Sequence, residues 1–288
     1  MRGSESSVIV IGAAIALGLA CGDSGPTGPG GGGGGGTAFY GTIDHSCTDL
    51  DQIPSEWIST VQDSFPVHYA HTSHGSQLTV GLERIEDEDA TYDVEIGYSY
   101  LPEAAGALCI FDGQEWETYI TPDLYWETAE GMDYTRDVLD SNPSIRVSMW
   151  CWCCQLDYYG EMEVLAYLDS MSQLESEYPD IEFVYMTGNA QATGIEGYQR
   201  YQRNEQIRQY CEQNDKTLFD FADLDAWWYN PSTSSWEHHW YDYGGIQVPG
   251  EHPQFHGDEA GHTTYESCEQ KARATWWLLA RIAGWPGP

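Results

Sequence analysis

Residues 67–77, with the sequence VHYAHTSHGSQ, decide the fold that we expect for this chain. The stretch opens with β-branched and aromatic residues that are typical of a strand. It then places histidines, serines and a glycine close together, which is typical of a tight polar turn. In the residues that follow, Leu78, Leu82 and Ile85 fall on one face of a helix. We therefore predict a strand, a turn and a helix, with Ser73 on the turn at the carboxyl end of the strand.

Strands and helices alternate along most of the remaining chain. Residues 92–100 and 106–113 are two candidate strands. The apolar patterns that follow predict strands at residues 145–152, 181–186 and 217–221, and helices at residues 161–177, 203–214 and 271–283. This alternation predicts an α/β protein, namely a three-layer α/β/α sandwich with a mostly parallel, flavodoxin-like sheet.

The start of the chain is expected to lie outside the folded domain. Residues 8–20 form a short apolar run that is typical of a signal peptide, and Cys21 follows it directly. This arrangement resembles a bacterial lipoprotein signal, in which that cysteine is lipidated; plain secretion is the alternative. Residues 22–36 are rich in glycine and predict a flexible tether. We thus expect a signal peptide over residues 1–21, one domain over residues 37–288, and an exported protein, either secreted or held at the outer membrane or cell surface.

The charge of the chain excludes some partners. The sequence has 46 acidic residues against 11 basic ones, which gives a net charge of −35. Such a surface repels nucleic acid and anionic membranes. We expect no nucleic-acid partner, and membrane contact only through the lipid anchor.

Cysteine usage gives a further expectation. If Cys21 carries lipid, seven of the eight cysteines remain. An exported protein is expected to oxidise most of them, so we predict disulfide bonds. The crowded segment WCWCC at residues 150–154 leaves their pairing open. A zinc site built from cysteines is the alternative.

The polar turns at the strand ends suggest acyl transfer. Ligands of parallel α/β sheets bind beyond the carboxyl ends of the strands. Acyl transfer needs a nucleophile, a base, an acid that orients the base, and oxyanion donors. We predict Ser73 as the nucleophile, with Ser76 as the fallback, His262 as the base and Asp258 as the orienting acid. The simpler alternative is that the first turn only caps a helix.

Other polar groups of the same turns are candidates for contact with the substrate or the oxyanion. They are the side-chain amides of two later turns and three residues of the first turn: Gln155, Asn189, His71, His74 and Gly75.

The order of these features resembles that of the SGNH (GDSL-like) hydrolases. The likeness rests on a serine in the first βα turn, amides in middle turns and a histidine before the last helix. Locally the sequence is similar to a divergent branch of exported bacterial proteins with an HTSHGSQ turn, here residues 71–77, and an ending such as residues 276–281, WWLLAR. The chain lacks the Gly-Asp-Ser turn of the family, and Gln155 takes the place of its asparagine.

The resemblance implies a serine esterase that needs no cofactor and acts on a small-molecule or polysaccharide ester. His252 precedes a proline as the family histidine does, so His252 is an alternative base, as is His256.

Two other classes of function remain open. His71, His74, His256 and His262 would suit zinc or copper if they converged at the sheet edge. The aromatic segments around residues 227–229 and 236–243 would suit a non-catalytic module that binds glycan or a partner on the cell surface.

Overall fold

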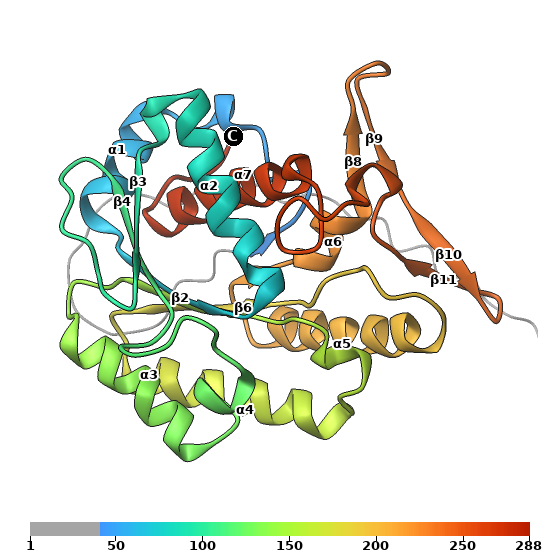
Figure 1. Ribbon diagram of the computed structural model, residues 1–288, viewed down its shortest axis with the longest axis horizontal. Helices are drawn as coiled ribbons and strands as arrows, with labels where there is room; N and C mark the ends of the chain where they lie inside the picture. The colour runs from blue at the N-terminus through green and yellow to red at the C-terminus, as the bar shows by residue number, and fades with distance from the viewer. Residues whose placement is uncertain (1–40) are drawn as a thin grey trace, which may run out of the picture. The chain divides into compact units, whose positions relative to one another are not determined.

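The structure, a computed structural model, describes residues 41–288, so the predictions for residues 1–36, with lipidation at Cys21, lie outside it. A seven-stranded sheet forms the centre of the described chain (Figure 1). Its strands are β1 (Thr42–Ile43), β2 (Val67–His71), β3 (Val94–Tyr98), β4 (Leu108–Asp112), β5 (Val147–Cys151), β6 (Glu182–Met186) and β7 (Leu218–Phe219). They lie in the order β1-β7-β6-β5-β2-β4-β3, and all adjacent pairs are parallel.

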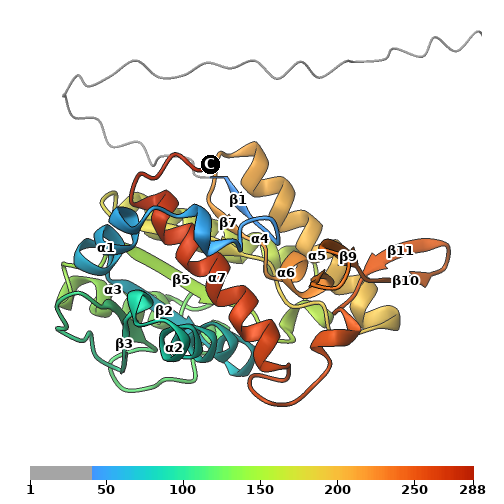
Figure 2. The ribbon, with the colours of Figure 1, turned by 90° about the horizontal axis from the view of Figure 1, so that it is seen from above.

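Helices cover both faces of this sheet, which confirms the predicted three-layer α/β/α sandwich. The helices are α1 (Ser55–Ser64), α2 (Ser76–Glu88), α3 (Ala129–Ser141), α4 (Glu161–Glu177), α5 (Gly194–Gln213), α6 (Phe221–Ala226) and α7 (Tyr265–Ile282). Helices α1, α2 and α7 lie on one face, and α3, α4 and α5 lie on the other (Figure 1). Figure 2 shows α7 crossing over the sheet beside α2. No helix within residues 41–288 is both long and apolar enough to cross a membrane.

The central strands are buried on both sides because helices cover both faces. All five residues of β2 and all five of β5 are buried. This burial explains why the strand at residues 145–152 is almost continuously apolar. It also places the polar turn after β2 at the end of a rigid, central strand.

Helix starts differ most from the prediction. Helix α4 spans the predicted residues, but α5 begins at Gly194 and not at residue 203, and α7 begins at Tyr265 and not at residue 271. The first turns of α5 lack an apolar stripe, because its buried face includes Arg200 and Asn204. Both side chains are hydrogen-bonded, which makes their burial possible.

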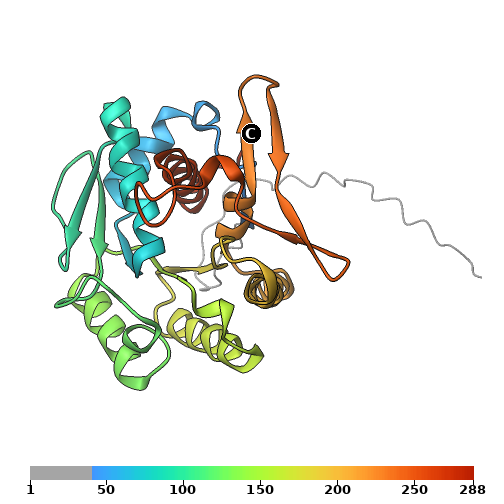
Figure 3. The ribbon, with the colours of Figure 1, turned by 45° about the vertical axis from the view of Figure 1, so that its right-hand side comes forward.

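The aromatic segments before the last helix form two antiparallel hairpins. One pairs β8 (Trp227–Asn230) with β9 (Ser235–His238), and the other pairs β10 (Trp240–Tyr243) with β11 (Ile246–Pro249). Figures 1 and 3 show these hairpins, in orange, extending away from the central sheet.

The prediction of disulfide bonds is wrong for the described residues. All seven cysteines in residues 41–288 are free. Five of them are buried, and they lie on strands, helices and turns that pack against other neighbours. The crowded cysteines of residues 150–154 therefore carry free thiols.

Candidate active site

The first βα turn is held tightly against the strand that precedes it. After β2, a 3₁₀ turn over Ser73–Gly75 leads directly into α2. A Cβ atom at Gly75 would lie 2.2 Å from the Cβ atom of His71, so only glycine fits there. The Tyr69 hydroxyl donates to the Gly75 carbonyl at 2.9 Å. The turn is thereby fixed, with Ser73 and His74 at the carboxyl edge of the sheet.

The turn after β5 places Cys153 beside this first turn, because β2 and β5 are adjacent strands. The main chain of Cys153 is held from two sides. Its N–H donates to Gln155 Oε1 at 2.7 Å, and its carbonyl accepts from Asn189 Nδ2, also at 2.7 Å. Asn189 follows β6, the next strand of the sheet. Three adjacent strand ends therefore determine where the Cys153 side chain lies.

Cys153 and His74 form a close thiol–imidazole pair. His74 Nδ1 lies 2.9 Å from Cys153 Sγ, and the Ser73 hydroxyl lies 3.4 Å from the same sulfur. Burial raises the pKa of the Cys153 thiol, but the hydrogen bond and positive charge of His74, together with hydrogen bonds from Ser73 and Thr72, outweigh burial and lower that pKa to about 5. Burial opposes protonation of His74, yet the bond to Cys153 raises its pKa. The favoured state is thus a thiolate–imidazolium pair.

Gln191 determines which nitrogen of His74 faces the thiol. Gln191 Nε2 donates to Glu251 Oε1 at 3.0 Å and to the His262 carbonyl at 2.7 Å. Both partners are acceptors, so Gln191 Oε1 faces His74 Nε2, at 2.8 Å. His74 therefore carries a proton on Nε2, and its Nδ1 exchanges a proton with Cys153.

The structure does not join the predicted serine triad by hydrogen bonds. Within residues 41–288, no histidine forms a hydrogen bond to the Ser73 hydroxyl, whose side-chain partner is Cys153. Ser76 Oγ donates to the Ser73 carbonyl at 2.7 Å. His262 lies next to the site, with its ring 4.8 Å from the His74 ring, but its Nδ1 is 3.9 Å from Asp258 Oδ1. The Asp258 side chain is 91% exposed, so water screens this pair.

The two alternative bases have other contacts. His252 stacks on Trp228, and its Nδ1 accepts from the main-chain N–H of Gln254. His256 is exposed, and its Nε2 lies 3.3 Å from the carbonyl oxygen of Glu251. Neither side chain contacts Ser73 or Cys153 through a hydrogen bond described for residues 41–288.

The two predicted oxyanion donors, Gln155 and Asn189, lie at the site, but they differ in whether their side-chain N–H₂ group already donates a hydrogen bond. The Asn189 amide is committed to the Cys153 carbonyl. Gln155 faces Cys153 with its oxygen, and its Nε2 donates no hydrogen bond within residues 41–288. That N–H₂ group is therefore available to a bound substrate.

The four histidines predicted as metal ligands do not meet at one point with ligand spacing within residues 41–288. His71, for example, has its ring nitrogens occupied by the Thr72 carbonyl at 2.7 Å and by Asp112 at 3.3 Å.

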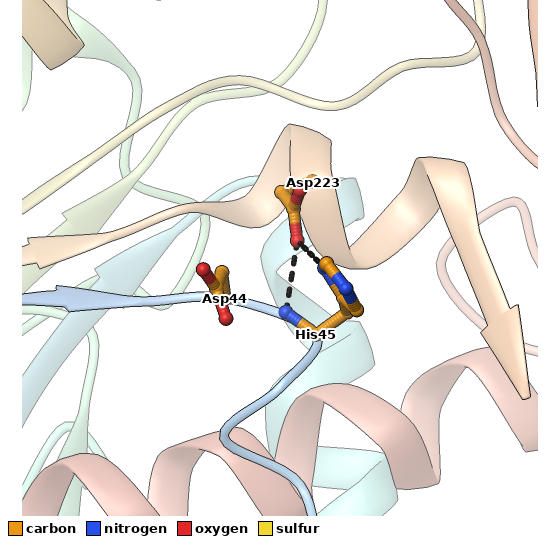
Figure 4. A group of neighbouring side chains, drawn as sticks. All are labelled: Asp44, His45 and Asp223. Carbon is orange, nitrogen blue, oxygen red and sulfur yellow. Dashed lines mark hydrogen bonds and ion pairs between the residues drawn. The ribbon is translucent and has the colours of Figure 1, made fainter. Parts of the chain in front are cut away.

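A different group of histidine and carboxylate side chains does have the spacing of metal ligands. It comprises Asp44 and His45, after β1, with Asp223 of α6 (Figure 4). Their ligand atoms all lie within 4.8 Å of one another. However, Asp223 Oδ1 already accepts from the His45 main-chain N–H at 2.8 Å and pairs with the ring Nδ1 at 2.6 Å. These bonds explain the cluster without a metal, as a link between the β1 loop and α6.

The residues that the sequence interpretation missed are Cys153, Gln191 and Glu251. The sequence pattern places Cys153 among the cysteines expected to form disulfide bonds and gives it no catalytic role. The signal available in the sequence was its position in a polar turn, directly after the buried strand predicted at residues 145–152. The chain matches no protein-family model and no curated protein, so the resemblance to SGNH hydrolases stays a prediction.

Proposed function

We propose that this protein is a hydrolase that cleaves an ester through a cysteine nucleophile, Cys153. The observation that supports this most is the 2.9 Å contact between Cys153 Sγ and His74 Nδ1, with Nε2 of the same ring held by Gln191. A nucleophile, a base and a group that orients the base are the parts that covalent catalysis requires. Cys153 is buried, with 7% of its surface exposed, so the substrate reaches it at the carboxyl edge of the sheet and not from open solvent.

The chemistry follows from the protonation states. The Cys153 thiolate attacks the carbonyl carbon of the ester, and a tetrahedral intermediate forms. The intermediate collapses to a thioester as the departing alkoxide takes the proton from His74 Nδ1. Water then attacks the thioester and gives a proton to His74, which releases the carboxylic acid and restores the ion pair.

The negative oxygen of the intermediate needs donors close to the sulfur. The Ser73 hydroxyl is one candidate, because it lies 3.4 Å from the sulfur. Gln155 Nε2 is the other, because the oxygen of the same amide accepts from the Cys153 main-chain N–H. In this mechanism the Ser73 hydroxyl donates a hydrogen bond to the oxyanion or to the Cys153 thiolate. The first βα turn, which carries Ser73 and His74, is therefore still part of the proposed active site. Attack by Ser73 itself is the competing mechanism.

Two covalent probes separate these mechanisms. We expect iodoacetamide to label Cys153 at pH 6, and hydrolysis of p-nitrophenyl acetate to show a burst that Cys153→Ala removes. The neighbouring Cys154→Ala is the matched control, because Cys154 is exposed and is not bonded to His74. Labelling by a fluorophosphonate that Ser73→Ala abolishes, with hydrolysis intact in Cys153→Ala, would establish the serine mechanism instead.

A second function, binding of carbohydrate, is supported by a cavity beside the β8–β9 hairpin. The cavity measures about 690 Å³, and its lining includes Tyr229, Trp236 and Arg273. Tyr229 is 44% exposed and packs edge-on against Trp236. Aromatic faces beside polar groups suit a sugar ring, which has apolar faces and hydroxyl edges. Such a site would bind the carbohydrate part of an esterified polysaccharide.

Affinity electrophoresis in gels that contain soluble β-glucan, xylan or mannan tests this function. We expect at least one polysaccharide to retard the protein, and Trp236→Ala to remove the retardation. Trp240→Ala is the control, because Trp240 is 45% exposed on the other hairpin and does not line the cavity. Equal mobility with and without all three polysaccharides would reject carbohydrate binding.

A further inference from the structure

The hydrogen bonds behind His74 continue to a buried carboxylate. Glu251 follows β11, and its main-chain N–H donates to the Ala190 carbonyl at 2.7 Å. Its Oε1 accepts from Gln191 Nε2 and from Thr263 Oγ1, both at 3.0 Å. Glu251 is thus the third link behind the sulfur, after His74 and Gln191.

The carboxylate of Glu251 holds Gln191 in one orientation. Gln191 has two N–H groups, and these reach Glu251 Oε1 and the His262 carbonyl. An ionised carboxylate is a stronger acceptor than a carboxylic acid, and bonds to charged acceptors are roughly twice as strong as neutral ones. When Glu251 is ionised, Gln191 therefore presents its oxygen firmly to His74 Nε2.

Glu251 lacks a strong positive partner of its own. Lys271 of α7 is fully buried and already pairs with Asp225 of α6 at 2.7 Å. Asp225 acts on Glu251 as a second negative charge, and His256 Nε2 lies 3.9 Å from Glu251 Oε2 on an exposed side chain. Burial and the charge of Asp225 raise the pKa of Glu251 to about 7, although Gln191, Lys271 and Thr263 oppose the shift.

We propose that Glu251 is a pH-responsive positioning residue, whose ionised carboxylate fixes Gln191 so that His74 stays paired with Cys153, and whose protonation loosens this arrangement. This inference rests on the proposed thiolate–imidazolium pair and adds regulation to it. Glu251 itself does not contact the sulfur. Its effect reaches Cys153 through three hydrogen bonds, namely Glu251 to Gln191, Gln191 to His74 and His74 to Cys153, so it changes the fraction and the orientation of the ion pair.

The direction of the effect follows from the raised pKa. A carboxyl group that titrates near neutrality is protonated at pH 5 and ionised at pH 8. The reactivity of Cys153 should therefore rise in two steps with pH, one for the thiol itself near pH 5 and one for Glu251 near pH 7. Ordinary thiols show a single step near their own pKa.

The test measures the alkylation rate of Cys153 by iodoacetamide between pH 5 and pH 9, by peptide mass spectrometry on the full chain. We expect wild type to show the second step, and Glu251→Gln to lack it and to react several-fold more slowly at pH 8. Glu259→Gln is the matched control, because it removes the same charge from an exposed residue nearby whose side chain accepts from Tyr265 N–H and not from Gln191. Glu251→Asp keeps the charge and should restore part of the second step.

A readout on wild type covers the case in which Glu251→Gln fails to fold. The ¹⁵N signals of the His74 ring, assigned with His74→Gln, should shift near pH 7 as well as at the ionisation of His74 itself. A folded Glu251→Gln protein whose profile matches wild type, or a wild-type His74 signal without the step near pH 7, overturns the role of Glu251. A Cys153 that does not react at pH 6 overturns the ion pair and with it the proposed function, so the two failures are distinct.

Discussion

Two polar regions meet at the carboxyl edge of the sheet, and they differ in how their side chains are held. The turns after β2, β5 and β6 hold His74, Cys153 and Gln191 in one chain of hydrogen bonds, in which His74 and Cys153 are buried and Gln191 is half-buried. The loop before α7 presents Asp258 and His262 with side chains 91% and 52% exposed. Both regions contain residue types suited to catalysis. Only the first combines burial with fixed partners, which is the condition that shifts a pKa and orients a base.

The largest effect is expected when the buried ion pair between Lys271 of α7 and Asp225 of α6 is broken. Lys271 and Asp225 are both 0% exposed and lie 2.7 Å apart. Replacing Lys271 with methionine leaves Asp225 as an uncompensated buried charge, and we expect the free energy of unfolding to fall by about 3–5 kcal/mol. Urea denaturation followed by circular dichroism measures this loss. Arg84→Met, which breaks the partly exposed pair with Glu269, should cost less than about 1 kcal/mol; equal losses would contradict the contrast.

The next test concerns the base. In His74→Ala, the Cys153 thiol loses the partner that lowers its pKa, so its pKa should return toward about 8.5. Alkylation by iodoacetamide at pH 6 should then slow by about two orders of magnitude, because the thiolate is the reacting form. In wild type the thiolate already predominates at pH 6, since the pKa is about 5.

His262→Ala is the control for this test, because His262 packs against the His74 ring and donates no side-chain hydrogen bond to it within the described residues. We expect the rate of Cys153 alkylation in His262→Ala to stay within about threefold of the wild-type rate, because this variant loses only a packing contact. Equal slowing in both variants would show that His262, and not the Cys153–His74 contact alone, sets the reactivity.

A smaller effect is expected at Asn189, which supports Cys153 without touching its sulfur. Its Nδ2 donates to the Cys153 carbonyl, and its Oδ1 accepts from the Gln191 N–H at 3.0 Å. Asn189→Ala leaves buried groups without partners, and we expect unfolding to become easier by about 1–3 kcal/mol. Thermal and urea unfolding measure this loss. An unchanged stability would mean that the two turns are held by other contacts.

The smallest effect is expected in the exposed loop. Asp258→Asn removes a charge from a side chain surrounded by water, so stability should change by less than about 0.5 kcal/mol. Hydrolysis of p-nitrophenyl acetate and alkylation of Cys153 should both remain within about twofold of wild type. Loss of hydrolysis in this variant, with alkylation intact, would restore the triad of Ser73, His262 and Asp258 that the sequence suggests.

The sequence predicted the architecture well because its signals are local. The strand at residues 145–152 contains β5, and the helix at residues 161–177 matches α4, since both patterns repeat over neighbouring residues. The start of α5 was missed because its buried residues, such as Arg200, are polar and depend on partners distant in the chain. The disulfide prediction failed for residues 41–288 because it used an expected compartment in place of distances between sulfur atoms.

By itself, the sequence determined that this protein is a parallel α/β protein and that polar turns gather at one edge of its sheet. It also drew attention to the turn that carries His74. Only the tertiary structure decided which side chains meet there. Cys153 is 79 residues from His74, and Gln191 is 117 residues from it, so no local pattern joins them. The order of β2, β5 and β6 in the sheet brings these three residues together, and burial between the turns gives their contact its chemistry.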